Sequence, residues 1–168
     1  RNPMNLANLG YDMQSISGGR FVLGLGSQIK PHIEKRFSSV WSHPVERMRE
    51  IVLAIKAIWQ CWEGKGALDF RGRFYTHTIM IPAFDPGPNP YGPPPIFTGG
   101  FGPRMTMVAG EAADGFIAHP FSTRRSLLEL TPGIGGYFEI KLGSFAEGKA
   151  TLGLYFDFVK EDDGPFSY

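Results

Sequence analysis

Two short apolar runs, each followed by residues with small side chains, constrain the fold of this 168-residue chain more than any other feature. Apolar runs of this length are typical of buried parallel strands. Glycine lets backbone N–H groups approach a ligand closely. The first strand is expected at residues 20–25 and is followed by Gly26, Ser27 and Gln28; the second is expected at 95–98 and is followed by Gly99, Gly100, Phe101 and Gly102.

The second loop leads directly into a helix expected over residues 103–113, with Pro103 in its first turn. A helix N-terminus holds phosphate through unpaired N–H groups and the positive end of its dipole. The first loop is not a dinucleotide fingerprint, because the third glycine of that motif would fall at Ile29. Two such loops predict a phosphorylated cofactor across the C-terminal ends of parallel strands. A plain tight turn is the alternative interpretation of each loop.

Strands and helices are expected to alternate along the chain. The strongest helix, over residues 43–62, has apolar residues at spacings of three and four. We also expect helices at 3–15 and 122–130 and a strand at 116–119. A hairpin at 67–82, a proline-rich surface connection at 85–95 and strands at 137–142 and 152–159 complete the pattern. The alternation favours a parallel α/β sheet or barrel. The apolar stripe of the strongest helix consists of Val45, Met48, Val52, Ile55, Trp59 and Trp62.

Composition excludes several classes of function. A formal net charge of +1 and scattered basic residues argue against nucleic-acid binding. The single cysteine, Cys61, excludes an internal disulfide and is interpreted as a packing residue. No apolar stretch reaches the roughly 18 residues of a membrane-spanning helix. We expect a cytoplasmic protein with a small organic substrate and no nucleic-acid or membrane partner. Because no methionine or signal peptide leads the chain, we also expect it to be the interior of a longer reading frame.

The histidines predict no metal site, because His32, His43, His77 and His119 lack metal-ligand spacing with one another or with acidic residues. His119 differs from the others in its place in the fold. It ends an expected barrel strand, where side chains usually face the ligand. We therefore hypothesise that His119 contacts substrate or cofactor. No catalytic residue is identified from the sequence.

Several motifs, in their order and spacing, resemble the luciferase-like monooxygenase superfamily, and most closely its deazaflavin (coenzyme F420)-dependent branch. The resemblance covers about residues 1–130 and leaves the glycine-rich residues 131–168 unassigned. The matching stretches are Ser17–Ser27, Arg47–Trp59, Tyr91–Ile96, Gly102–Gly115 and His119–Thr123.

The resemblance implies a fragment of a TIM-type (α/β)₈ barrel, with parallel strands, outer helices and the cofactor over the C-terminal face. It places Gly26, Ser27 and Gln28 where the family's post-strand loop meets the cofactor. It places Gly99, Gly100, Phe101 and Gly102 in the family's phosphate-binding loop. For the full-length parent, a homodimer is an open alternative.

The implied function is F420-dependent hydride transfer to or from an organic substrate. An FMN-dependent monooxygenase of the same superfamily is the first alternative. A truncated product without enzymatic activity is the second. The family's early strands, which carry polar groups near the reactive ring, would lie before Arg1.

We predict that residues 1–168 alone show no measurable F420- or FMN-dependent turnover. Catalysis needs the reactive ring held within about 3–3.5 Å of the substrate, which an open partial barrel does not maintain. A steady-state assay with alcohols, aldehydes and ketones checks this expectation. Turnover on the order of 1–10 per second would contradict it.

Overall fold

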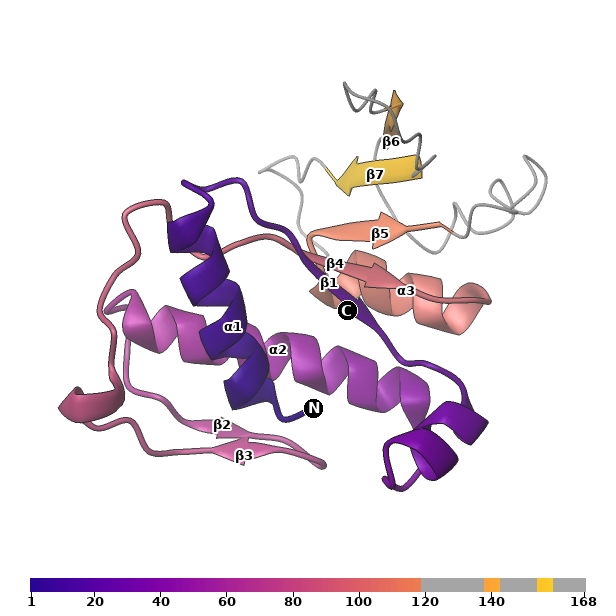
Figure 1. Ribbon diagram of the computed structural model, residues 1–168, viewed down its shortest axis with the longest axis horizontal. Helices are drawn as coiled ribbons and strands as arrows, with labels where there is room; N and C mark the ends of the chain where they lie inside the picture. The colour runs from indigo at the N-terminus through magenta and orange to yellow at the C-terminus, as the bar shows by residue number, and fades with distance from the viewer. Residues whose placement is uncertain (119–137, 143–153, 159–168) are drawn as a thin grey trace, which may run out of the picture.

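The computed structural model describes residues 1–118 and the strands at 138–142 and 154–158 (Figure 1). His119 and the helix expected at 122–130 therefore lie outside the described residues. A π-helix spans His32–Arg36 and a short 3₁₀ helix spans Pro82–Phe84. The other elements are α1 (Pro3–Ile16), β1 (Leu23–Gly26), α2 (Pro44–Trp62), β2 (Phe70–Arg71), β3 (Thr76–His77), β4 (Ile96–Gly99), α3 (Pro103–Ala112), β5 (Gly115–Ile117), β6 (Phe138–Leu142) and β7 (Leu154–Phe158).

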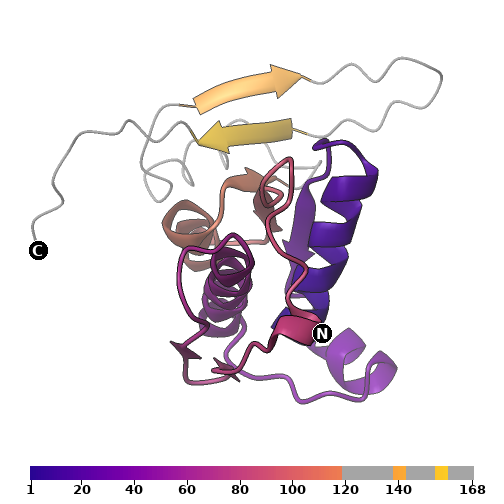
Figure 2. The ribbon, with the colours of Figure 1, turned by 90° about the vertical axis from the view of Figure 1, so that its left-hand side faces the viewer.

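The main sheet has the strand order β1-β4-β5-β7-β6. Its first three strands are parallel neighbours, which confirms the expected arrangement. Strand β7 runs antiparallel to both β5 and β6. Strands β6 and β7 form one end of the sheet (Figure 2). The register sets Gly26 beside Gly99, and Gly99 beside Ile117. The last residues of the three parallel strands therefore share one edge.

Three glycines lie in strands that were expected to exclude them. Gly26 and Gly99 are the last residues of β1 and β4 rather than part of the following loops, and Gly115 begins β5, one residue before the strand expected at 116–119. The cause at Gly115 is packing. A Cβ atom there would lie 2.6 Å from Cε1 of Phe97, so only glycine allows this ring to cross the neighbouring strand.

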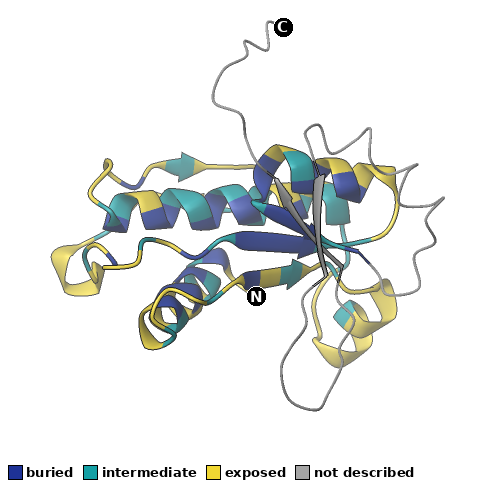
Figure 3. Ribbon diagram, turned by 90° about the horizontal axis from the view of Figure 1, so that it is seen from above, coloured by how far each residue is buried: buried dark blue, intermediate teal, exposed yellow. Residues whose placement is uncertain are grey.

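The core lies between the helices and one face of the sheet, where Leu23 and Ile96 are buried (Figure 3). Helix α2 occupies the centre of this layer and packs against both α1 and α3. Five members of its predicted stripe are at most 4% exposed, while Val45 is half-buried. The Trp59 indole donates to the carbonyl of Ala7 at 3.0 Å and so joins α2 to α1. The buried stripe members are Met48, Val52, Ile55, Trp59 and Trp62.

Asp114 connects the starts of two strands to α2. Its backbone N–H donates to the carbonyl of Ile96 at 2.8 Å, and its Oδ2 accepts the Ile96 N–H at 2.8 Å. Its Oδ1 accepts from Lys56 Nζ at 2.7 Å. Since Ile96 begins β4 and Asp114 immediately precedes β5, one side chain joins both strands to the covering helix.

The proline-rich connection before β4 is anchored by a polar cluster. Tyr11 Oη donates to Glu63 at 2.5 Å and accepts the N–H of Asn89 at 2.8 Å. The Asn89 amide donates to Ser15 Oγ at 2.8 Å. Burial and the hydrogen bond to Glu63 raise the pKa of Tyr11, so the phenol keeps its proton at neutral pH. The connection is thus held against α1 and α2.

The predicted hairpin is present, with β2 antiparallel to β3. The carboxylate of Glu50 on α2 accepts the N–H groups of Arg73, Phe74 and Tyr75 at 3.1, 2.7 and 2.7 Å. These bonds attach the turn between β2 and β3 to helix α2. Over the part of the chain that the structure describes, no helix is both long and apolar enough to cross a membrane.

We predict that Ile55→Ala lowers the free energy of unfolding by about 2–5 kcal/mol, because Ile55 is fully buried and its loss leaves a cavity. Ile79→Ala is the matched control. Ile79 is 75% exposed, so the change should stay within about 0.5 kcal/mol. Urea denaturation of both variants measures the difference, and equal stabilities would contradict the packing described for α2.

Candidate functional site

The candidate site is the edge where β1, β4 and β5 end. A Cβ atom added at Gly26 would meet nothing within 4 Å. One added at Gly99 would lie 3.7 Å from the Ile117 carbonyl, which is ordinary contact. Neither glycine is therefore required by neighbouring side chains of the described structure. Among the described residues, none fills the space beside Gly26.

The sheet face opposite the helices carries no ionisable group on these three strands. Side chains alternate along a strand, so Leu23 and Ile96 face the helices while Gly24, Gly26 and Phe97 face away. The sequences of β1, β4 and β5 contain only glycine, threonine and apolar residues. A ligand bound to this part of the sheet would contact backbone groups and apolar side chains. It would meet no acidic or basic side chain on these strands.

The loop after β1 has an unusual backbone conformation. Gln28 has φ +60°, in the left-handed region that residues other than glycine rarely adopt. Ser27 Oγ donates to the Gln28 carbonyl at 3.2 Å, and Gln28 is exposed. A residue in this region costs about 1–2 kcal/mol, and such strain is concentrated at ligand sites.

The second loop ends at an uncapped helix. Gly102 is the N-cap of α3, with φ +82°, and no side chain caps the helix. The Gly102 carbonyl accepts from the N–H and Oγ1 of Thr106 at 3.2 and 3.1 Å. The first N–H groups of an α-helix have no intrahelical partner. The start of α3 can therefore donate to an anion.

Gly100 has a structural role that corrects our interpretation of the glycine-rich loop. The sequence analysis interpreted the glycines of this loop as allowing close approach of a ligand to the backbone. A Cβ atom at Gly100, however, would collide with Met105, which is 6% exposed in the core. Gly100 is thus required by packing, while Gly99 and Gly102 are not crowded by any side chain.

The other histidines of the described structure and Cys61 do not gather at this edge. His43 is the N-cap residue of α2 without a side-chain cap hydrogen bond, His32 lies in the exposed π-helix, and His77 is half-buried in β3. Burial lowers the pKa of His77, so its imidazole stays neutral at pH 7. Cys61 packs beside the core, as interpreted. Among the described residues no cluster of histidine, cysteine and acidic side chains could hold a metal ion.

Sequence reasoning missed one contact near the site. Arg104 in the first turn of α3 donates to Glu46 in the first turn of α2 at 2.9 Å. The hydrogen bond from its own backbone N–H, and then the charges of Arg104 and His43, hold the pKa of Glu46 below its usual range. The two residues are 58 positions apart, and no local pattern indicates their pairing.

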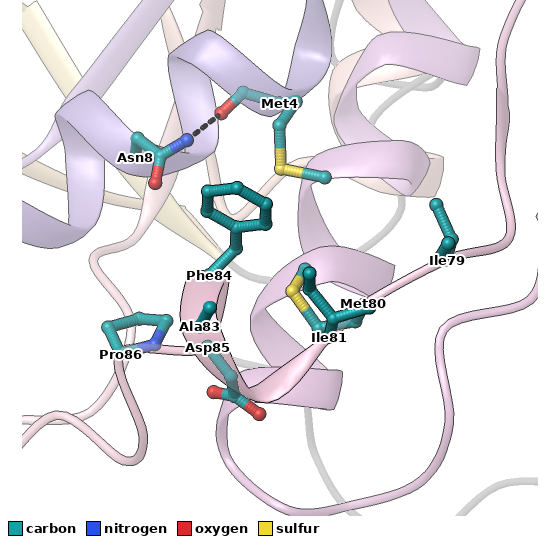
Figure 4. Close-up of a pocket in the computed structure, with 9 residues that line it drawn as sticks. All are labelled: Met4, Asn8, Ile79, Met80, Ile81, Ala83, Phe84, Asp85 and Pro86. Atoms are coloured by element: carbon teal, nitrogen blue, oxygen red, sulfur yellow. Dashed lines mark hydrogen bonds between the residues drawn. The ribbon is translucent and has the colours of Figure 1, made fainter.

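A separate cavity of about 500 Å³ lies between the start of α1 and residues 79–86 (Figure 4). Met4, Met80 and Phe84 line it with apolar atoms, and Asp85 is its one ionisable lining residue. It is not lined by any residue of the glycine edge. It has no arrangement of groups suited to catalysis.

Comparison with known proteins matches the chain to a family. Residues 1–132 match the family described as luciferase-like monooxygenase. An uncharacterized protein of Mycobacterium tuberculosis is 53% identical over 131 residues, which are 78% of this chain and 38% of that protein. The chain thus spans less than half the length of this relative.

Two further relatives have names that state an activity. A 5,10-methylenetetrahydromethanopterin reductase of Archaeoglobus fulgidus is 37% identical over 64% of this chain and 30% of its own length. An F420-dependent glucose-6-phosphate dehydrogenase of Nakamurella multipartita is 31% identical over 69% of this chain and 32% of its own length.

A solved structure shows the fold. The coenzyme F420-dependent tetrahydromethanopterin reductase of Methanopyrus kandleri aligns with a TM-score of 0.60 and 23% identity, covering 80% of this chain and 40% of that chain. The parallel strands β1, β4 and β5 with their outer helices are a fragment of a TIM-type (α/β)₈ barrel, as expected.

We predict that Gly100→Val destabilises the fold by about 1–3 kcal/mol, because the new side chain overpacks the site of Met105. The double variant with Met105→Ala should lose less stability than the two single changes together, since alanine vacates the crowded space. Urea denaturation of the three variants measures this coupling. Strictly additive losses would show that Met105 is not the cause.

Proposed function

Because the chain belongs to the luciferase-like monooxygenase family, we propose that it forms the phosphate-binding edge of an F420-dependent oxidoreductase. The single observation that carries the proposal is the register at the sheet edge. It sets Gly26 beside Gly99, each without a crowding side chain, directly before the uncapped start of α3. Backbone donors and open space are what a phosphorylated cofactor requires.

Each part of the edge has a role in the proposal. The N–H groups at Gly102 and in the first turn of α3 bind the phosphate, where the positive end of the helix dipole favours an anion. Gly26 and Gly99 leave room for the body of the cofactor, and Ser27 and Gln28 contact it from the strained loop. Phe101, which is 76% exposed, lies in the loop and limits water access. His119 remains a candidate for contact with substrate or cofactor.

The chemistry belongs to the cofactor. When bound, F420 supplies a hydride to an organic substrate or accepts one from it. The residues of this chain would bind and orient the cofactor. The apolar surface of β4 and β5 would keep water from the reactive ring of the cofactor. Any proton transfer falls to side chains outside β1, β4 and β5, since these strands carry none that titrates near neutral pH.

The relatives favour F420 over FMN. Those with a named activity include an F420-dependent dehydrogenase, and the solved neighbour is F420-dependent. An FMN-dependent monooxygenase is the second candidate, because the matched family is described by monooxygenase activity. Titration of the chain with each cofactor, followed by fluorescence, discriminates the two: we expect saturable F420 binding and weaker FMN binding. Equal affinities would remove the preference for F420.

We predict that Gly26→Val weakens F420 binding at least about tenfold, because the valine side chain occupies the open space where the cofactor lies. The free energy of unfolding should change by less than about 1 kcal/mol, since no neighbour is displaced. Gly24→Val, on the same strand and face but farther from its C-terminal end, is the control. Unchanged affinity in a folded Gly26→Val variant would refute the proposed location.

A further inference from the structure

A cationic cluster lies at the start of α2, apart from the glycine edge. The guanidinium carbons of Arg47 and Arg73 lie 4.4 and 5.2 Å from the centre of the Phe74 ring. The His43 ring is centred 5.5 Å from the same ring, and its Nε2 lies 3.4 Å from Arg73 Nη2. We call these four residues the Phe74 cluster. They bring two guanidinium groups and an imidazole onto one phenylalanine.

Within the described part of the chain, neither Arg47 nor Arg73 forms an ion pair with a carboxylate. The nearby acids have other partners: Glu46 bonds Arg104 at 2.9 Å, and Glu50 accepts backbone N–H groups of the hairpin turn. The Arg47 Nε donates to the neutral hydroxyl of Ser42 at 2.9 Å.

The position of the cluster adds to its positive potential. Arg47 lies at the N-terminal end of α2, where the helix dipole disfavours cations. His43 forms no side-chain cap hydrogen bond there. The two guanidinium charges thus lie near a positive helix end that also disfavours them, and an anion would relieve this repulsion. Guanidinium groups match the geometry of carboxylate and phosphate oxygens.

We propose that the Phe74 cluster binds the phosphate or carboxylate group of a small anionic ligand. A net charge of +1 over the whole chain favours a small molecule over a nucleic acid. The Glu46–Arg104 bond joins the starts of α2 and α3, so the cluster lies at the same end of the sheet as the glycine edge. The proposal does not depend on F420 binding.

Titration of the chain with inorganic phosphate at constant ionic strength tests the proposal. The Nε–Hε signals of Arg47 and Arg73 in heteronuclear NMR spectra should shift saturably. Arg73→Gln should raise the apparent dissociation constant at least about fivefold, because it removes a charge-assisted donor. Arg71→Gln is the matched control, with the same loss of charge two positions away. Arg71 is exposed and pairs with Asp69 at 2.8 Å, so we expect less than about a twofold change.

Equal weakening in Arg73→Gln and Arg71→Gln, or signals that shift without saturating, would overturn the proposal. Arg73 is exposed, so its variant should keep the fold, and circular dichroism checks this. Arg73→Lys keeps the charge and loses the planar fork, and it should bind phosphate with intermediate affinity.

Repeating the titration with F420 assigns the source of the anion. Competition supports an anionic group on the cofactor, and independent binding supports a separate ligand.

Discussion

The candidate site depends on the two bonds that the carboxylate of Asp114 accepts, one from the backbone of β4 and one from Lys56 of α2. Because Asp114 also directly precedes β5, these bonds set β4 and β5 level with each other at their starts. Parallel strands that start level end level, and this places Gly99 beside Ile117. An exposed ion pair alone contributes little, but here a backbone bond accompanies it.

Much of the fold could be predicted from the sequence because its signals are local. The apolar stripe of α2 repeats every three or four residues, and burial of Ile55 and Trp59 follows from that spacing. The order of the parallel strands followed from alternation and resemblance. The sheet edge was also predicted, since glycines follow both apolar runs. The ends of these strands differ from the expected ends by one to three residues, because hydrogen bonds to neighbouring strands determine where a strand begins and ends.

What could not be predicted depends on tertiary packing or on contacts between residues far apart in the sequence. The requirement for Gly100 comes from Met105, whose position is known only once α3 packs on the sheet. The Glu46–Arg104 pair and the Phe74 cluster join α2 to residues 27 to 58 positions away. Glycine therefore has two distinct uses at the C-terminal end of β4. At Gly100 it accommodates the core, and at Gly99 it leaves the surface open.

The absence of ionisable side chains from β1, β4 and β5 has a consequence for enzymology. Substitutions in these strands can change how tightly or in which orientation a ligand is held, and they remove no group that titrates between pH 5 and 9. For the oxidoreductase proposed above, the pH profile of turnover is therefore set by other segments. A variant of the glycine edge that loses rate should keep the parent's profile shape, so pH dependence separates ligand placement from proton transfer.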